Sequence, residues 1–456
     1  MSTPMVRRRQ LVRGAAAACA VTAVSGIASA CGVNTAKAAK TTTAQNRTVV
    51  TFSPWSGTRS PAVKNLYQQV VDKFNNQQGS IEVKVTPISQ GNFPGTAASI
   101  LAGTAPDIFE DWRSSVYVQP GLLLDLTGYV NGHDMSIFNQ STLKHFTQGG
   151  KLYAMPVSIE SVVTAVNLSM LDAAGASYPP QTWTTDQAKT VYETLAKPGA
   201  STPRYGGVFY FDYGYPIPAY LHGFKASYVD PSDPSQCALG SADAVTCGEY
   251  IFGLVNSKVC GYLQSGKSSA ALGQDQLGTS LCGSWMLPEY ASLPSSVKWE
   301  FYPMPAGPGG STTYGSVAMY GIPATTKHPK EAWSFLEWIS FQPTFQKALI
   351  QMFLLPPATI PLYADWVALA KAYAPTLGNK NLEAFQGSLA DAIVPADFQY
   401  DSSNAFTLVS KGCSQITSTG AAVAEVFPAI ATQVDAFEKT QASTASSSSA
   451  SAPKSS

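Results

Sequence analysis

Aromatic and acidic side chains occur along this chain where they could bind a neutral, ring-shaped molecule. A flat aromatic ring packs against an apolar C–H face, and a carboxylate accepts hydrogen bonds from hydroxyl groups. The candidates follow predicted strands or lie in loops rich in Gly and Tyr: Trp55, Phe93, Asp111, Trp112, Glu160, Tyr213, Trp285 and Tyr314. Charged residues make up only 13% of the 456 residues, whereas Tyr, Phe and Trp number 21, 20 and 8. This balance favours an uncharged ligand.

Each candidate also has a purely structural interpretation. Trp55 could cap the core, Asp111 could be the N-cap of a helix, and Glu160 could be a solvated loop charge. The tyrosines could simply pack within their loops. Three further tryptophans occupy helix positions and are expected in the core: Trp183, Trp333 and Trp338.

The elements that must position these side chains alternate between strand and helix. Segments 48–52, 81–85 and 107–109 have strand character. A helix that begins at Ser60-Pro61 separates the first two, and a short helix at 95–101 precedes the third. This order predicts an open, largely parallel sheet covered by helices. Ligands bind at the carboxyl ends of such strands, so the loops at 53–58, 89–93 and 110–113 are expected to converge.

The second half of the chain follows the same alternation. Residues 162–167 are an apolar run of strand type, and Thr184 with Gln187 forms a capping box before a helix. Pro329 begins another helix with one apolar side. We therefore expect two α/β halves, with the chain crossing between them more than once.

The N-terminus has the features of an export signal. Basic residues at 7–9 and 13 precede an apolar stretch at 14–28, which is too short to span a bilayer. Residues 1–30 are therefore predicted to be a signal peptide, and Arg8-Arg9 fits a twin-arginine pattern, with general secretion as the alternative. Ala28 to Cys31 resembles a lipobox, although Ala28 stands where Leu is usual. We predict lipidation of Cys31 and a tether over 31–46; ordinary cleavage near Ala30 is the alternative.

The cysteine, histidine and charge content indicates which covalent links, metal sites and partners to expect. Five cysteines follow the anchor, and Cys237 and Cys247 bracket a short polar loop that a disulfide could close. The sequence has no C-x-x-C pair and only four scattered His, so we expect no metal site and no cofactor. Without residues 1–30 the chain carries 25 basic and 29 acidic residues, which argues against a nucleic-acid partner.

Eight fragments, in order over about residues 48–350, resemble the family 1 extracellular solute-binding proteins of bacterial ABC importers. They are VTFSPW at 50–55, GTAPDI at 103–108, GLLLDL at 121–126, GKLYAMP at 150–156, VN at 166–167, PPQTW at 179–183, GSW at 283–285 and AWSFL at 332–336. The segments at 205–228 and 233–260 fit the family pattern poorly.

The resemblance implies a two-lobed α/β fold of the periplasmic-binding-protein type II, with a hinge between the lobes. Lobe 1 would comprise residues 47–159 plus 316–370 and lobe 2 residues 160–315 plus 371–440, followed by a disordered Ser/Ala-rich tail at 441–456.

It also implies a monomeric, non-catalytic subunit held at the outer face of the membrane by its lipid anchor. Such a subunit would bind a mono- or oligosaccharide in an aromatic cleft between the lobes and deliver it to the transmembrane subunits of a permease.

Three alternatives come from other interpretations of the same residues. A binding protein for a non-sugar solute would share the fold. A secreted glycoside hydrolase would need two facing carboxylates, but Glu110 and Asp111 are adjacent on a strand, so their side chains should diverge. The G-x-S-x-G elbow of many hydrolases is absent. A surface adhesin would not explain aromatic residues that gather at strand ends.

Overall fold

The computed structural model describes residues 46–54, 61–86, 93–111, 117–118, 121–209, 216–233, 235–262, 268–388, 392–393 and 403–450. Residues 1–30, the predicted signal peptide, and the candidates Cys31, Trp55, Trp112 and Tyr213 lie outside these ranges, so the predictions about them concern residues that the structure does not describe.

The strands are β1 (Thr48–Ser53), β2 (Ile81–Val85), β3 (Ile108–Asp111), β4 (Thr147–Gln148), β5 (Lys151–Leu152), β6 (Ala154–Asn167), β7 (Gly207–Phe209), β8 (Cys260–Tyr262), β9 (Thr279–Gly283), β10 (Trp299–Tyr302), β11 (Thr313–Gly321) and β12 (Ala392–Ile393).

The helices are α1 (Pro61–Gln77), α2 (Phe93–Leu101), α4 (Gln140–His145), α5 (Leu168–Ala174), α6 (Thr185–Leu195), α7 (Pro216–Gly223), α8 (Ala242–Asn256), α9 (Ser268–Gly273), α10 (Leu287–Ala291), α11 (Pro329–Phe341), α12 (Pro343–Phe353), α13 (Ile360–Tyr373), α14 (Glu383–Ser388), α15 (Ser403–Thr419) and α16 (Val423–Ala450), with short 3-10 turns η2 (Met135–Ile137), η3 (Ser284–Met286) and η4 (Pro375–Leu377).

The main sheet has the strand order β10-β6-β11-β3-β1-β2, with β9 paired to β6 and β12 to β11. β1 lies parallel to both β2 and β3, as the strand–helix alternation predicts. β11, however, runs antiparallel to β3 on one side and to β6 on the other. The sheet is therefore mixed, and the expectation of a largely parallel sheet was wrong beyond the first three strands. β11 enters from a distant part of the sequence, so no local crossover fixes its direction.

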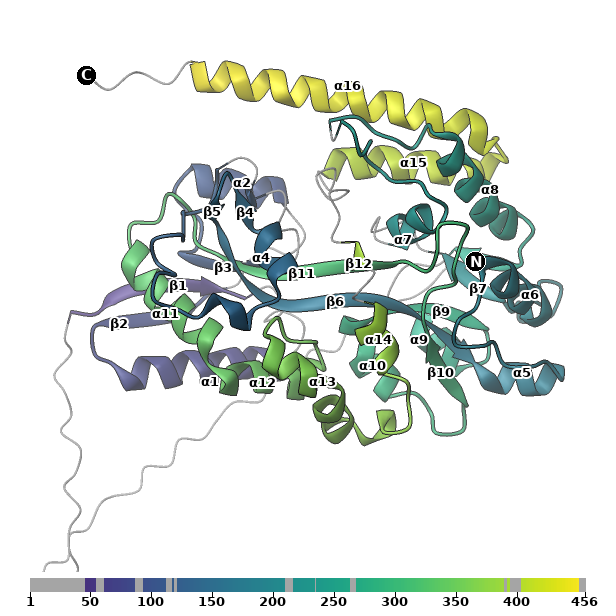
Figure 1. Ribbon diagram of the computed structural model, residues 1–456, viewed down its shortest axis with the longest axis horizontal. Coiled ribbons are helices and arrows are strands. Elements are labelled where there is room, and N and C mark those ends of the chain that lie inside the picture. Colours follow the sequence, from purple (N-terminus) through teal and green to yellow (C-terminus); the bar gives the residue numbers. More distant parts are fainter. Residues whose placement is uncertain are drawn as a thin grey trace, which may run out of the picture. The chain divides into compact units, whose positions relative to one another are not determined.

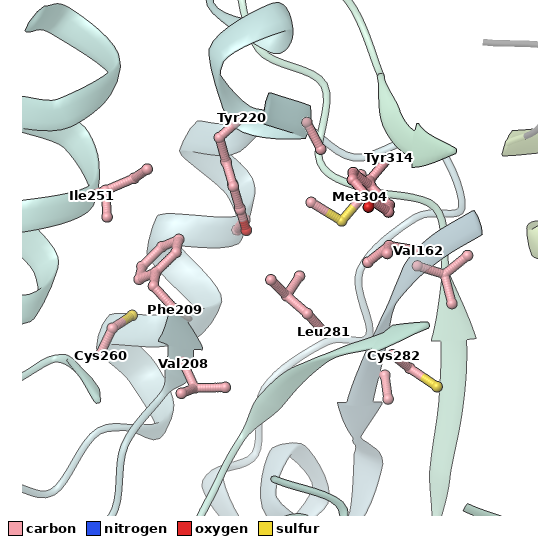
Figure 2. Packing of buried hydrophobic residues seen from close by; sticks show 14 of the residues in the cluster. Val162, Val208, Phe209, Tyr220, Ile251, Cys260, Leu281, Cys282, Met304 and Tyr314 are labelled. Carbon is pink, nitrogen blue, oxygen red and sulfur yellow. The ribbon is translucent and has the colours of Figure 1, made fainter. Parts of the chain in front are cut away.

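Two hydrophobic cores lie along this sheet, which we call the first and second core. The first core is built from residues of 50–159 and 317–358. The second core, part of which is drawn in Figure 2, is built from residues between 162 and 434. Trp366 of α13 belongs to the second core, although the predicted boundary assigned it to lobe 1.

β6 and β11 contribute to both cores and lie side by side (Figure 1). On β6, Ile159 packs in the first core and Val162 in the second. On β11, Val317 packs in the first core and Tyr314 in the second. These two strands therefore pass from one core to the other within about three residues.

Local sequence signals account well for the helices. On α1, Tyr67, Val70, Val71 and Phe74 are all buried, which confirms the predicted apolar face. Thr184 and Gln187 form both hydrogen bonds of the capping box at the start of α6. Trp183 and Trp333 are buried, as expected for core residues.

The C-terminal helix α16 differs from the prediction. It packs closely on α8. The close approach is seen at Gly248 of α8, where a Cβ would lie only 2.6 Å from Cγ1 of Val423. The helix then continues to Ala450, so residues 441–450 of the predicted disordered tail are helical. After Pro428 no proline or glycine interrupts the Ala-rich stretch up to that residue, which allows the helix to propagate. In the part of the chain that the structure describes, no helix is both long and apolar enough to cross a bilayer.

The expected disulfide between Cys237 and Cys247 is not formed. Cys247 is a buried free thiol on the inner face of α8, where it packs in the second core. The backbone N–H of Cys237 instead donates to the Asp435 carboxylate at 2.7 Å, which fixes that loop to α16. Non-covalent packing thus holds the segment that the disulfide was expected to close.

Candidate functional site

Glu160 lies at the centre of β6, between the two cores. Its partner in the β6–β11 register is Ser316. The hydroxyl of Ser158 donates to Oε1 of Glu160 at 3.3 Å, which is consistent with side chains two positions apart sharing one face of a strand. Glu160 is half-buried, so its carboxylate is partly shielded from water at the point where β6 and β11 pass from one core to the other. Glu160 is thus positioned by a strand and not by the loop of the alternative interpretation.

The position of Trp285 follows from β9, the other neighbour of β6 in the sheet. In the antiparallel pairing of β9 with β6, Gly283 stands opposite Val162. A Cβ on Gly283 would lie 2.3 Å from Cζ2 of Trp285, so the indole fills the space that a side chain would occupy. Opposite residues of an antiparallel pair project to the same face. The Trp285 ring therefore lies on the face of β6 that carries both Val162 and Glu160.

This arrangement explains why glycine precedes Trp285. A glycine lets another group approach its backbone closely. In the structure the ring that follows makes the close approach, and it remains partly exposed while packing against the second core. A partly exposed indole and a half-buried carboxylate on one face of β6 offer an apolar surface and a hydrogen-bond acceptor.

Tyr314 is less accessible than its predicted role requires. It lies on β11, two positions before Ser316, and is only 2% exposed. Its ring packs in the second core with Val162 and Met304 (Figure 2). Tyr314 thus stabilises β11 by packing in the second core, and its ring is almost fully buried.

The two acidic residues at the end of β3 point to opposite faces, as predicted. Glu110 accepts a hydrogen bond from the Tyr67 hydroxyl of α1 at 3.0 Å. Asp111 accepts one from the Tyr117 hydroxyl at 2.7 Å. Glu110 and Asp111 are 5% and 2% exposed. The opposed pair of carboxylates that a glycoside hydrolase needs is not formed by these two residues.

The remaining candidates follow strand ends. Trp55, Trp112 and Tyr213 come two, one and four residues after β1, β3 and β7, and all three lie outside the described residues. Phe93 is the first residue of α2. The described residues place Glu160 and Trp285 on one face of β6, and the grouping of the candidates into one ligand site stays a prediction.

Three contributors were missed from the sequence. Ser158 could have been found, because its spacing of two from Glu160 is a strand signal. Tyr117 and Ser316 carried no such signal. Their roles depend on a hydrogen bond across six residues and on a strand pairing between residues more than 150 positions apart.

Two α/β cores joined by shared strands, with an indole and a carboxylate on the face of those strands, define a two-lobed binding protein. The chain belongs to the bacterial extracellular solute-binding protein family, whose profile matches residues 69–376. Membership of this family implies that the folded chain works outside the cytoplasm, and the relatives and solved neighbours are themselves binding proteins.

Among curated proteins, the chain is similar to a maltotriose-binding protein of Pyrococcus abyssi, at 23% identity over 55% of this chain and 54% of that protein. It also resembles a probable ABC transporter-binding protein of Deinococcus radiodurans, at 25% identity over 54% of this chain and 62% of that protein. The chain thus spans little more than half the length of these relatives.

Solved structures match over nearly their whole length. An ABC substrate-binding protein of Listeria monocytogenes in complex with cycloalternan superposes with a TM-score of 0.72 at 20% identity, covering 86% of this chain and 99% of that one. The cyclic alpha-maltosyl-1,6-maltose binding protein of Arthrobacter globiformis gives 0.69 at 18% identity, covering 86% and 100%. These likenesses establish the two-lobed periplasmic-binding-protein fold.

Proposed function

We propose that this chain is the extracytoplasmic substrate-binding subunit of an ABC importer and that it binds a mono- or oligosaccharide. The observation that carries the proposal is that the Trp285 indole and the Glu160 carboxylate lie on one face of β6, a strand shared by the two cores. A sugar offers an apolar C–H face to the ring and hydroxyl groups to the carboxylate. The relatives whose names include maltotriose, cycloalternan and maltosyl-maltose support the same ligand class.

The ligand site would be completed by residues that follow the strand ends. We assign Trp55, Phe93, Trp112 and Tyr213 to it, because each follows a strand on the side where ligands bind in open α/β sheets. Closure of the two lobes would enclose the sugar between aromatic faces contributed by distant parts of the chain. The permease would then receive it without any chemical change.

A binding assay with a turnover control tests this proposal. Purified chain is screened by thermal shift against maltotriose, mannotriose, cycloalternan, polyols, amino acids and polyamines. Stabilisation by a saccharide without release of products supports binding, because a ligand of the native state alone raises the melting temperature. Release of shorter sugars would support a hydrolase instead, and stabilisation by amino acids or polyamines alone would identify a non-sugar solute.

A Trp285→Ala variant locates the site. Loss of one buried aromatic contact should weaken saccharide binding by about 1–3 kcal/mol. Tyr373→Ala is the matched control, since Tyr373 is 38% exposed at the last position of α13 and should leave affinity unchanged. Equal affinity of both variants and the unaltered chain would contradict the assignment.

We further propose that lipidated Cys31 anchors the monomeric chain to the outer face of the membrane after twin-arginine export. Acyl chains on one cysteine, followed by the predicted tether at 32–46, would keep the receptor near its permease. A Cys31→Ala variant should appear in the medium or in a soluble extracytoplasmic fraction. A variant with Lys at both Arg8 and Arg9 should accumulate inside the cell, and continued export would point to general secretion.

A further inference from the structure

Ser158 is a buried serine at a point where β6 has a backbone neighbour on each side. On one side it stands opposite Ala318 of β11 in the antiparallel pairing. On the other side it forms an isolated antiparallel bridge with Pro357. Ser158 is 2% exposed, and its hydroxyl donates to Oε1 of Glu160 at 3.3 Å. A buried hydroxyl is costly unless it is hydrogen-bonded, and Glu160 supplies such a bond.

The second of these neighbours belongs to residues 354–358, which we call the connecting segment. The backbone N–H of Ile159 donates to the carbonyl of Pro356 at 3.0 Å. The backbone N–H of Ala358 donates to the carbonyl of Val157 at 3.4 Å. These two bonds lie on either side of the serine along β6, so the backbone that carries its hydroxyl is held by a segment distant in sequence.

The connecting segment passes between the cores and is itself firmly fixed. Phe353 packs in the first core and Leu354 in the second. Leu354 has φ 57° and ψ 20°, a left-handed conformation that is uncommon for a bulky residue and persists only where the surroundings impose it. Its carbonyl accepts from the indole N–H of the buried Trp366 at 2.9 Å. The segment that holds the serine is therefore itself held by both cores.

We propose that Ser158 is a positioning residue that orients the Glu160 carboxylate for the ligand and does not touch the ligand itself. The inference rests on the proposed function and deepens it, because Glu160 is the group that would accept hydrogen bonds from the sugar. The burial of Ser158 leaves almost no surface for a ligand to contact. A flexible carboxylate loses rotamer freedom when it binds a ligand, and a hydroxyl that already orients it lowers that cost.

Two substitutions of Ser158 test the proposal, with maltotriose, mannotriose and cycloalternan as probes in isothermal titration calorimetry. Ser158→Ala should raise the Kd of a bound saccharide by about 3- to 10-fold, because at 3.3 Å the lost hydrogen bond is a long one. Ser158→Thr keeps the hydroxyl, and a small cavity lined by Ser158, Gln346 and Leu349 has room for part of the added methyl group. It should restore most of the affinity that Ser158→Ala loses. Equal weakening in both variants would show that packing, not the hydroxyl, matters and would overturn the proposal.

A double-mutant cycle tests whether Ser158 acts through Glu160. In a Glu160→Ala background, Ser158→Ala should have no further effect on the Kd, because the group that the hydroxyl orients is gone. The same loss in both backgrounds would overturn the proposal. Ser340→Ala is the matched control, since Ser340 is equally buried at 2% exposure but lies on α11, and its Kd should be unchanged. An unchanged Kd in Ser158→Ala as well would overturn the positioning role and leave the proposed function intact.

A second readout needs no ligand. Crystal structures of the unaltered chain and of Ser340→Ala should each show the Glu160 side chain in one rotamer, whereas Ser158→Ala should show it in more than one. If the unaltered chain binds no saccharide, the proposed function fails while this measurement still tests whether the hydroxyl orients the carboxylate. The same single rotamer of Glu160 in Ser158→Ala would overturn the inference on its own.

Discussion

Substituting Gly283 by Ala should disturb the candidate site without removing any group from it. The new Cβ would lie 2.3 Å from Cζ2 of Trp285 and 2.4 Å from Cε2 and Cη2. Carbon atoms in van der Waals contact are about 3.5–4.0 Å apart, so the indole must move by more than about 1 Å. Gly283 has φ −76° and ψ 148°, a conformation that Ala adopts without strain. The backbone can therefore stay in place while the ring is displaced.

The displaced ring should weaken saccharide binding by roughly 5- to 100-fold, because a stacking contact depends on alignment at the scale of an ångström. Overpacking should cost about 1–2 kcal/mol of the free energy of unfolding. Calorimetric titration gives the first quantity and urea denaturation the second. Red-shifted tryptophan fluorescence in the variant would report that the ring has moved toward water.

Two controls separate ring displacement from general destabilisation. Gly273→Ala places a Cβ 2.9 Å from Cδ2 of Leu293, so it crowds a side chain that packs against the second core. It should cost stability with unchanged affinity. In a Trp285→Ala background, Gly283→Ala should have no further effect on binding, since the clashing ring is gone. If Gly283→Ala moves the ring but binds sugar as tightly as the unaltered chain, Trp285 is not a ligand contact and the reasoning fails.

Three further predictions concern buried residues: a histidine, four cysteines and a glycine. Burial lowers the pKa of His145 from 6.5 to about 4, so the unfolded chain binds a proton more readily than the folded one between these values. Stability should therefore fall by about 1–2 kcal/mol as the pH drops from 7 to 4, allowing for the partial exposure of the ring, and by less in a His145→Phe variant; urea midpoints across that range measure the difference. Maleimide should leave four thiols unlabelled in the native chain and label them in urea, because burial raises their pKa and excludes the reagent: Cys247, Cys260, Cys282 and Cys413. Gly248→Val should lower the free energy of unfolding by about 1–3 kcal/mol, because its side chain would collide with Val423 and Phe427 of α16, and an unchanged urea midpoint would refute the close packing of α8 on α16.

The sequence predicted the elements that depend on neighbouring residues. The strand at 48–52, the apolar face of α1 and the capping box of α6 are each signalled by residues within about a dozen positions, and the structure contains each of them. β6 was harder to predict, because Ser158, Glu160 and Ser161 interrupt its apolar run. Of this single strand of 14 residues, only the part at 162–167 was predicted as a strand.

The direction of β11 and the neighbours of Glu160 could not be predicted in the same way. They depend on pairings such as Glu160 with Ser316 and Val162 with Gly283, which join residues more than 100 positions apart. Hydrophobic periodicity reports which face of an element is buried but not which element covers it. The failed disulfide has a similar cause: spacing brings Cys237 and Cys247 near in sequence, while helix α8 turns Cys247 into the core.

The position of Glu160 links recognition to the strands that join the cores. Ile159 is held in the first core and Val162 in the second, so any bending of β6 between the cores must pass through the residues between them. Ser161, one of these, is fixed by its hydroxyl to the Phe385 carbonyl at 3.0 Å and is fully buried. Glu160, its neighbour, projects to the other face of the strand, where Trp285 lies. A ligand bound to Glu160 and Trp285 would therefore contact the segment about which the lobes must move, and its binding free energy would act directly on that motion.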